Sequence, residues 1–284
     1  MNLEFIKANS EVFVPDGKPV DEALQRTTHM TISAHHDDIE IMAYHGIAEC
    51  FNSNSNWFSG VVVTNGAGSS KGEFYRSFSE EEFINIRKLE QKKAAFIGEY
   101  SAVAMLNYTS SEAKDPDNTE IIKDLKLLIS KAKPVVIYTH NLFDKHKTHL
   151  SVGLKVIEAI RDLEPIERPK KLYGCEVWRS LDWLVSSDRV IFDASANPNI
   201  ASALIEVYNS QISGNKEYHK AAIGRRDANA TFYSSHSPDS SKNTILGMDL
   251  TPLIVDTALD ISSFAQGFIE RFNLEAVNAI KDAL

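Results

Sequence analysis

Four consecutive side chains that can bind a metal ion or carry a proton occur in TISAHHDDIEI, residues 31–41: His35, His36, Asp37 and Asp38. His35 and Asp38 are three residues apart at a turn into a helix, a spacing that lets both side chains face one point, with Asp37 directed slightly aside. A neutral imidazole and a carboxylate are good zinc ligands, and a catalytic zinc site needs three protein ligands plus one open position. The stretch therefore supplies two ligands and a spare carboxylate.

An aspartate in the first turn of a helix also has a structural role, because it caps the helix and complements the helix dipole. Asp37 or Asp38 alone would be interpreted as such a cap. Four groups of this kind in a row at the end of an apolar run exceed what capping requires, so the pattern favours a functional site.

A second group of candidate ligands lies in HNLFDKHKTHLSVG, where His140, Asp144, His146 and His149 follow another apolar run. Isolated histidines in a polar loop before a helix are commonly just solvated. Three histidines within ten residues at a strand end favour function instead. The two groups can share one ion only if the strands before them are neighbours, which the sequence alone does not establish.

The elements that must position these residues alternate between strands and helices. Short β-rich apolar runs predict buried strands at 30–34, 60–64, 102–108 and 134–139. Amphipathic spacing predicts helices at 39–51, 80–98 and 119–131. This alternation predicts an α/β fold with a parallel sheet covered on both faces, in which ligands collect beyond the carboxyl ends of strands. Both candidate groups follow such ends.

The second half of the chain is less regular. KLYGCEVW (171–178) and DRVIFD (188–193) resemble further strands, IASALIEVYNSQI (200–212) a helix, and 259–284 one or two more helices. SSHSPDSSKN (234–243) is polar and predicts a surface loop. No internal repeat or long linker is evident, so the simplest expectation is one domain over 1–284 with a C-terminal elaboration. The pattern gives no role for residues 231–284.

Composition limits the class of protein. The chain has 284 residues, 43% hydrophobic and 24% charged, which is ordinary for a globular protein with a substantial core. Cys50 and Cys175 are too few and too far apart for a disulfide framework or a cysteine zinc site, which suggests a reducing compartment. The formal net charge of −9 argues against nucleic acid as the main partner. With no secretory pattern at the start and no apolar run near ~20 residues, we expect a soluble cytoplasmic protein without a membrane partner.

Five segments of the sequence resemble those of a known family. AHHDDIE is similar to the AHPDDxE signature of the PIG-L/LmbE-like zinc deacetylases, which remove acetyl groups from N-acetylglucosamine-type substrates. Four further segments resemble that family in the same order: VVVTNGAG, RKLEQKKAAFIG, DKHKTH and YNSQI. The resemblance spans about residues 28–230, and the order of the five segments is more specific than any one of them.

The resemblance implies roles for the candidate residues. It makes His35, Asp38 and His149 the ligands of one catalytic Zn²⁺, in a donor set that other divalent metals could also occupy. It makes Asp37 the general base. It makes His146, in its protonated form, the group that stabilises the developing oxyanion or protonates the leaving amine. In the implied reaction the metal lowers the pKa of a water towards ~7, and hydrolysis of the amide releases acetate and an amine.

The resemblance also implies that Arg87 contacts the substrate, although a helix arginine near Glu82 and Glu90 would otherwise be interpreted as solvated and salt-bridged. It implies a Rossmann-like three-layer α/β/α sandwich with a mostly parallel sheet, in agreement with the independent strand and helix pattern. The expected partner is a small molecule, an N-acetylated amino sugar or its conjugate. The long C-terminal helices could pack on their own domain or on a neighbour, as in a homo-oligomer.

The sequence departs from the family pattern in three places. His36 replaces the usual proline, which frees the turn and adds an imidazole near the metal. Thr148 stands where the family has an aspartate that would orient the neighbouring histidine, a role that Asp144 could take over. The segment TNGAGS lacks the glutamate common after its glycine. These departures affect the expected substrate more than the expected metal.

Two alternatives share the same residues. Two histidines and a carboxylate also describe the facial triad of non-haem iron oxygenases, but those are usually built on β-barrels rather than on an α/β sheet. The departures at His36 and Thr148 could instead mark a family member that binds metal and glycan without deacetylase activity. Retention of Asp37 counts against that alternative, because a binding module needs no base beside its metal. Surface or packing roles are the default for His45, His219, Arg225, Arg226 and Trp178.

Overall fold

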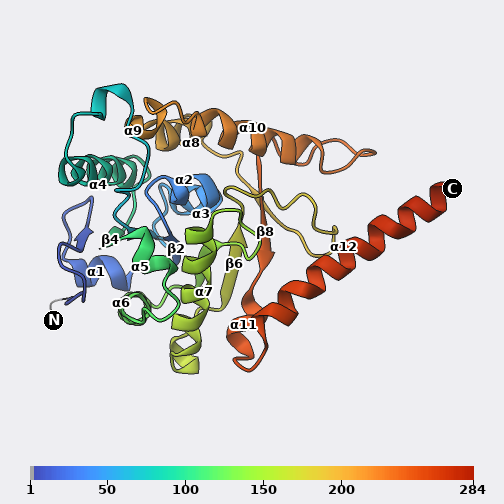
Figure 1. Cartoon of the computed structure of the whole chain (residues 1–284), viewed down its shortest axis with the longest axis horizontal. Helices are drawn as coiled ribbons and strands as arrows, with labels where there is room; N and C mark the ends of the chain where they lie inside the picture. Colours follow the sequence, from blue (N-terminus) through green and yellow to red (C-terminus); the bar gives the residue numbers. More distant parts are fainter. Residues whose placement is uncertain (1–2) are drawn as a thin grey trace.

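The computed structural model describes residues 3–284 and contains an eight-stranded sheet with the strand order β1-β4-β3-β2-β5-β6-β8-β7 (Figure 1). The strands are β1 (Glu11–Phe13), β2 (His29–Ser33), β3 (Phe58–Thr64), β4 (Ala102–Tyr108), β5 (Val136–His140), β6 (Lys171–Cys175), β7 (Val190–Asp193) and β8 (Thr244–Asp249). The run β4-β3-β2-β5-β6 is parallel. Strands β1, β7 and β8 pair antiparallel at the two sides of that run.

Helices cover both faces of the sheet. The helices are α1 (Val20–Gln25), α2 (Asp38–Met42), α3 (Tyr44–Cys50), α4 (Glu80–Ile97), α5 (Ser110–Lys114), α6 (Glu120–Ala132), α7 (Lys147–Arg161), α8 (Pro198–Glu206), α9 (Asn209–Ile212), α10 (Tyr218–Thr231), α11 (Thr251–Val255) and α12 (Ile261–Ala283). Figure 1 shows α2, α3, α4, α8 and α10 on one side of the sheet and α1, α6, α7 and α11 on the other.

Each face of the sheet has its own hydrophobic core. In β3, Val61 and Val63 contribute to the core beneath α1, α6 and α7, whereas Val62 between them contributes to the core beneath α2, α3 and α4. This alternation follows from the two-residue period of a strand, and a strand buried on both faces is apolar throughout. The predicted α/β/α sandwich with a mostly parallel sheet is thereby confirmed.

The predicted helix 39–51 is two helices rather than one. Its backbone breaks at Ala43, where φ is −129° and ψ 24°, so that α2 has only five residues. The predicted helix 200–212 likewise divides into α8 and α9. The helix predicted at 80–98 is continuous: its N-cap Ser79 and Glu82 form a reciprocal capping box.

Other elements had no counterpart in the sequence prediction. These are β1, α1, α5, α10, β8 and α11, and β8 inserts between β6 and β7 in the sheet. The loop predicted at 234–243 precedes β8, and α12 accounts for most of the predicted helical region 259–284. Among the described helices, none combines the length and the apolar character that crossing a bilayer would require.

Candidate active site

The two groups of candidate ligands follow neighbouring strands. His35 to Asp38 come directly after β2, and His140 to His149 come at and after the end of β5, which pairs in parallel with β2. The chain runs from β2 towards β3 and β4 on one side and returns to place β5 on the other. This change of direction makes the carboxyl ends of β2 and β5 the switch point at which such sheets bind ligands.

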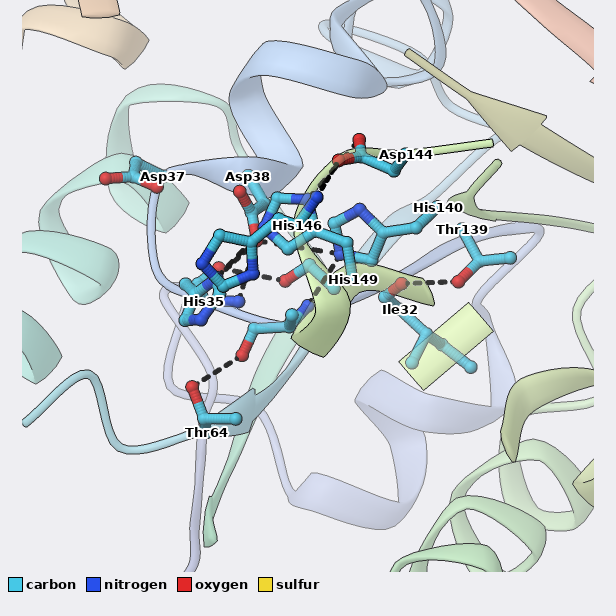
Figure 2. A network of polar contacts seen from close by, with 12 residues as sticks. Ile32, His35, Asp37, Asp38, Thr64, Thr139, His140, Asp144, His146 and His149 are labelled. Atoms are coloured by element: carbon cyan, nitrogen blue, oxygen red, sulfur yellow. Dashed lines mark hydrogen bonds and ion pairs between the residues drawn. The ribbon is translucent and has the colours of Figure 1, made fainter. Parts of the chain in front are cut away.

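Three donor atoms meet at that switch point (Figure 2). His35 Nδ1 lies 3.1 Å from His149 Nε2 and 3.2 Å from Asp38 Oδ2, and His149 Nε2 lies 3.3 Å from the same carboxylate oxygen. Ligand atoms on one tetrahedral ion with bonds of 2.0–2.1 Å are separated by about 3.3 Å. The spacing, the burial of Asp38 and His149, and the donor types all fit a zinc-like ion. Among the described residues, His146 with His35 and His149, and His140 with Asp38 and His149, are also close enough to hold one.

Charge at the cluster also suits a cation. Burial disfavours the charged form of Asp38, yet the imidazoles of His149 and His35 hold the pKa of Asp38 well below its usual value. His149 is itself buried, but Asp38 and Asp144 raise its pKa above the usual value. Asp144 Oδ2 lies 3.5 Å from His149 Nδ1, on the side of the ring away from Asp38. A carboxylate in this position fixes the ring orientation and raises its basicity.

His140 is buried beside the cluster rather than on the surface. Its ring stacks on that of His149 with centroids 4.0 Å apart, and its Nε2 accepts a hydrogen bond of 2.8 Å from the backbone N–H of Ala34. Nε2 also lies 3.6 Å from Asp38 Oδ2. Because Nε2 accepts from the backbone, His140 supports the turn after β2 more directly than it could bind an ion.

Asp37 lies at the N-terminal end of α2 with φ 83°, in the left-handed region. Such a conformation is uncommon for a residue other than glycine, and it turns the carboxylate aside from the three donor atoms (Figure 2). Burial raises the pKa of Asp37 to about 8, although the nearby Arg87 guanidinium opposes the shift. The chain thus holds a buried, basic carboxylate next to the cluster.

Arg87 is not the solvated side chain that its position on a helix suggested; its exposed fraction is 1%. Nη2 donates to the carbonyl of His36 at 2.8 Å and lies 3.4 Å from Asp37 Oδ2. Within the described part of the chain, its Nε and Nη1 have no hydrogen-bond partner. Arg87 therefore fixes the turn that carries Asp37.

His146 joins the cluster from the N-terminus of α7. Its ring centroid lies 4.9 Å from that of His35, and Asp144 Oδ1 accepts from its backbone N–H. Burial, together with the neighbouring His149, lowers the pKa of His146 to about 4. The free chain thus favours a neutral ring here, unlike the protonated form expected from the sequence.

Both residues that replace a family residue, His36 and Thr148, are buried. His36 has no exposed surface, and neither ring nitrogen has a partner among residues 3–284. A Cβ added to Gly66, whose φ is 73°, would lie 3.2 Å from His36 Nδ1, so this ring fills space beneath the loop after β3. Thr148 lies in the first turn of α7, next to the cluster.

A cavity of about 1030 Å³ opens over the cluster. It is lined by His35, Asp37, Asp38, Arg87, His146 and Thr148, by Gly66, Gly68, Ser69 and Ser70 of the loop after β3, and by a wall from Trp178 and α10. The surface position expected of Arg226 is wrong, because Arg226 is 2% exposed. Trp178, expected to pack in the core or at an edge, lines the cavity. Arg226 donates to the carbonyls of Glu40 and Ile41 at the end of α2.

Tyr218 and Gln211 also line the cavity and were not anticipated as site residues. Tyr218 opens α10, and its half-buried ring lies 6.0 Å from Trp178. Burial raises its pKa to about 12, with a further contribution from Asp37. Gln211 belongs to the S-Q pair of the YNSQI segment, which was the available sequence signal.

Residues 30–160 match the PIG-L family model, described as GlcNAc-PI de-N-acetylase. No curated protein sequence matches the chain. The recognition of this family from the sequence is therefore supported by a match that covers the first candidate group and the second.

Several solved structures share the fold. An N,N'-diacetylchitobiose deacetylase from Pyrococcus horikoshii has a TM-score of 0.64 at 16% identity, over 81% of this chain and 86% of that one. A 4-carboxy-2-hydroxymuconate hydratase from Pseudomonas putida KT2440 has a TM-score of 0.62 at 17% identity, over 79% of this chain and 96% of that one. The A40926 pseudoaglycone deacetylase has a TM-score of 0.58 at 16% identity, over 80% and 98%.

Proposed function

Because residues 30–160 carry the PIG-L family match, we propose that this chain is a metal-dependent hydrolase that removes an N-acetyl group from an amino sugar or its conjugate. The observation that carries the proposal is the triangle of His35 Nδ1, Asp38 Oδ2 and His149 Nε2, with edges of 3.1–3.3 Å. These three residues are the proposed ligands of one divalent ion, with zinc the best match to two imidazoles and a carboxylate.

Asp37 is the proposed general base. An ion held by the three donors supplies Lewis acidity, which polarises an acyl carbonyl and acidifies a water. Asp37 lies beside the donors without joining them, and burial makes it more basic than an exposed carboxyl. Its carboxylate would accept the proton of the attacking water. Arg87 keeps it in place through its contacts with Asp37 and His36.

His146 is the proposed donor on the opposite side of the cluster. A neutral imidazole retains one N–H, so His146 can donate a hydrogen bond to the developing oxyanion, and a ring that has first taken up a proton can pass it to the leaving nitrogen. Its backbone N–H is held by Asp144, which also faces His149. One carboxylate thus fixes a proposed ligand and the proposed acid relative to each other.

The cavity suits a conjugate better than a free monosaccharide. Its volume of about 1030 Å³ lies at the upper end of ordinary ligand pockets, which occupy about 300–1,000 Å³. Trp178 offers an aromatic face beside His146, with ring centroids 6.1 Å apart. We propose that the N-acetylated ring binds at the cluster and that a second group extends along the wall formed by Trp178 and α10.

Acetate release tests this function. The zinc-loaded protein should release acetate from N-acetylglucosamine-type compounds, and Asp37→Ala should lose most of that activity while keeping its metal. Acetate release that is unchanged in Asp37→Ala would remove the assigned base. Metal content and ligand affinity without any acetate from a panel of free and conjugated sugars would instead support the alternative, a metal- and glycan-binding protein without deacetylase activity.

A further inference from the structure

Helix α12 leaves the body of the protein halfway along its length. Figure 1 shows its C-terminal half projecting away from the sheet and from the other helices. From residue 269 to 284 every residue is exposed except Ala276, which is partly buried. Beyond the contacts of Arg271 with Asp188 and of Phe272 with Trp183, described below, this half of the helix therefore has no cover from the described chain.

The N-terminal half of α12 is firmly attached. Phe268 is 6% exposed and belongs to the hydrophobic core, with its ring centroid 6.2 Å from that of Phe143. Arg271 Nε donates to Asp188 Oδ2 at 2.6 Å, and Phe272 lies 5.7 Å from Trp183. No glycine or proline follows these anchors. The direction of the projecting half is thus fixed, and it cannot fold back onto its own body without breaking the helix.

The face that anchors α12 continues outward as an apolar stripe. Residues 261, 265 and 268 on the body are followed at helical intervals by Ile269, Phe272, Ala276, Ala279, Ile280 and Ala283. Ile269 is 50% exposed and Ile280 61% exposed. Isolated helices of ~12–15 residues are marginal in water, so a projecting helix with an apolar stripe is stable only when a partner covers the stripe.

We propose that the stripe binds the same stripe of a second copy of this chain, as an antiparallel helix pair about a two-fold axis near Ala276. This inference does not depend on the proposed function. The alanines let two helices approach within the ~8–10 Å of packed helices, and a two-fold pair buries each stripe with a single type of contact.

Apolar exposure and charge both favour this partner. On the stripe, Ile269 is 50%, Phe272 39% and Ile280 61% exposed, so a pair would cover three large apolar side chains on each chain. Arg271 and Asp282 lie on one flank of the stripe, eleven residues apart. In an antiparallel pair, Arg271 of each copy, which Asp188 of its own chain holds in position, faces Asp282 of the other copy at both ends.

An anionic membrane surface is a poorer partner. Amphipathic helices that bind such surfaces are rich in lysine and arginine on their polar face. Residues 269–284 carry Glu270, Glu275 and Asp282 against Arg271 and Lys281, in a chain with a formal net charge of −9. The acidic excess would repel anionic lipids.

Light scattering during gel filtration of the full zinc-loaded chain tests the pair. At about 20 μM the wild type should elute at twice the 31.7 kDa of one chain, and Ile280→Glu should elute as a monomer. Leu274→Glu is the matched control: Leu274 is also 61% exposed, but it lies on the opposite side of the helix, so the dimer should persist. Unchanged thermal unfolding of both variants shows that the body is intact.

Cross-linking tests the orientation. Cys50 and Cys175 are buried, so Ala276→Cys introduces one accessible thiol near the proposed two-fold axis. Oxidation should convert it to a disulfide-linked dimer, whereas Lys281→Cys, on the outer face, should remain largely unlinked. A wild-type monomer, a dimer that survives Ile280→Glu, equal cross-linking at both positions, or binding of the wild type to anionic vesicles would each overturn the proposal.

Discussion

Ser210 donates two hydrogen bonds to Glu90, from its backbone N–H to Oε1 at 2.7 Å and from its hydroxyl to Oε2 at 2.6 Å. The two residues are 120 positions apart and come from two segments that resemble the same family, RKLEQ and YNSQI. Because α4 carries both Arg87 and Glu90, this contact ties the cavity wall at α9 to the helix that holds Asp37 in place. Glu90 is thus a structural support of the proposed site.

The Glu90 contact predicts a pH-dependent stability. Burial raises the pKa of Glu90 above its usual 4.5, although the bonds from Ser210 oppose the shift. A carboxyl group whose pKa is higher in the folded than in the unfolded protein contributes its full stability at a pH below the unfolded-state pKa. That contribution is lost as the pH rises through the folded-state pKa. Glu90→Gln keeps the shape of the side chain but does not ionise, so it does not lose stability as pH rises. The free energy of unfolding of Glu90→Gln minus that of the wild type should therefore increase from about pH 4 to about pH 7. Thermal or urea unfolding across this range measures the difference, and a constant or falling difference would contradict it.

Glu90→Ala serves as the contrasting variant. It leaves the buried N–H and hydroxyl of Ser210 without their acceptor, which costs about 1–3 kcal/mol. The loss should be present at every pH, whereas the Gln variant should differ from wild type in a pH-dependent way.

Asp37→Asn should strongly reduce catalysis while leaving the metal in place. Asparagine tolerates the left-handed conformation at φ 83° and keeps the turn, but it accepts no proton. A lost general base lowers kcat by about 10²–10⁴-fold. The measurement is acetate release together with metal content per chain. Asp37→Asn protein that turns over at the wild-type rate would show that another group is the base.

Asp144→Ala should weaken metal binding more than Thr148→Ala. Asp144 faces His149 Nδ1 at 3.5 Å, and removal of such a carboxylate typically lowers metal affinity by about 10–100-fold. Thr148 is the residue at which the family has an aspartate, and its side chain makes no hydrogen bond in the described chain. Competition with a chromogenic chelator measures both affinities. Equal losses in the two variants would mean that Asp144 has not taken over the orienting role.

Metal removal should lower the melting temperature. An ion held at about 100 times its Kd stabilises the folded chain by about 2.7 kcal/mol, or about 5 °C for a chain of this size. Chelation should lower the Tm of the wild type by that amount. The Tm of His149→Ala should not change on chelation, because this variant lacks one proposed donor. Calorimetry with and without chelator, checked by elemental analysis, measures both. A chelator-sensitive Tm in His149→Ala would place the ion elsewhere.

The central fold was predictable because its strands are unbroken apolar runs. The strand predicted at 102–108 coincides with β4, and those at 30–34, 60–64 and 134–139 differ from β2, β3 and β5 by one or two residues at their ends. Strands buried on both faces leave this signal in the sequence. The order of the strands in the sheet leaves no such signal in the sequence. Only the structure therefore shows that the candidate ligands after β2 and after β5 lie together.

Residues of the cavity wall were missed for a different reason. In α10, Ala222, Arg226 and Ala230 are buried at intervals of four, the spacing of one helix face. Because an arginine lies in the middle of that face, the sequence pattern indicated surface charge rather than burial. Similarly, Gly247 interrupts the apolar run of β8 because a Cβ there would lie 2.7 Å from the Phe192 ring. Burial of a polar residue, and close approach to a ring, depend on neighbours that are distant in sequence.

The left-handed backbone conformation at Asp37 limits which residues can replace it by mutation. Only asparagine and glycine share the ease of aspartate in that backbone conformation, and asparagine is one nucleotide change from aspartate. A single exchange of a carboxylate oxygen for an amide nitrogen would therefore remove the proposed general base and keep the backbone turn. One mutation at this position would convert the proposed hydrolase into a protein that binds its ligand without cleaving it.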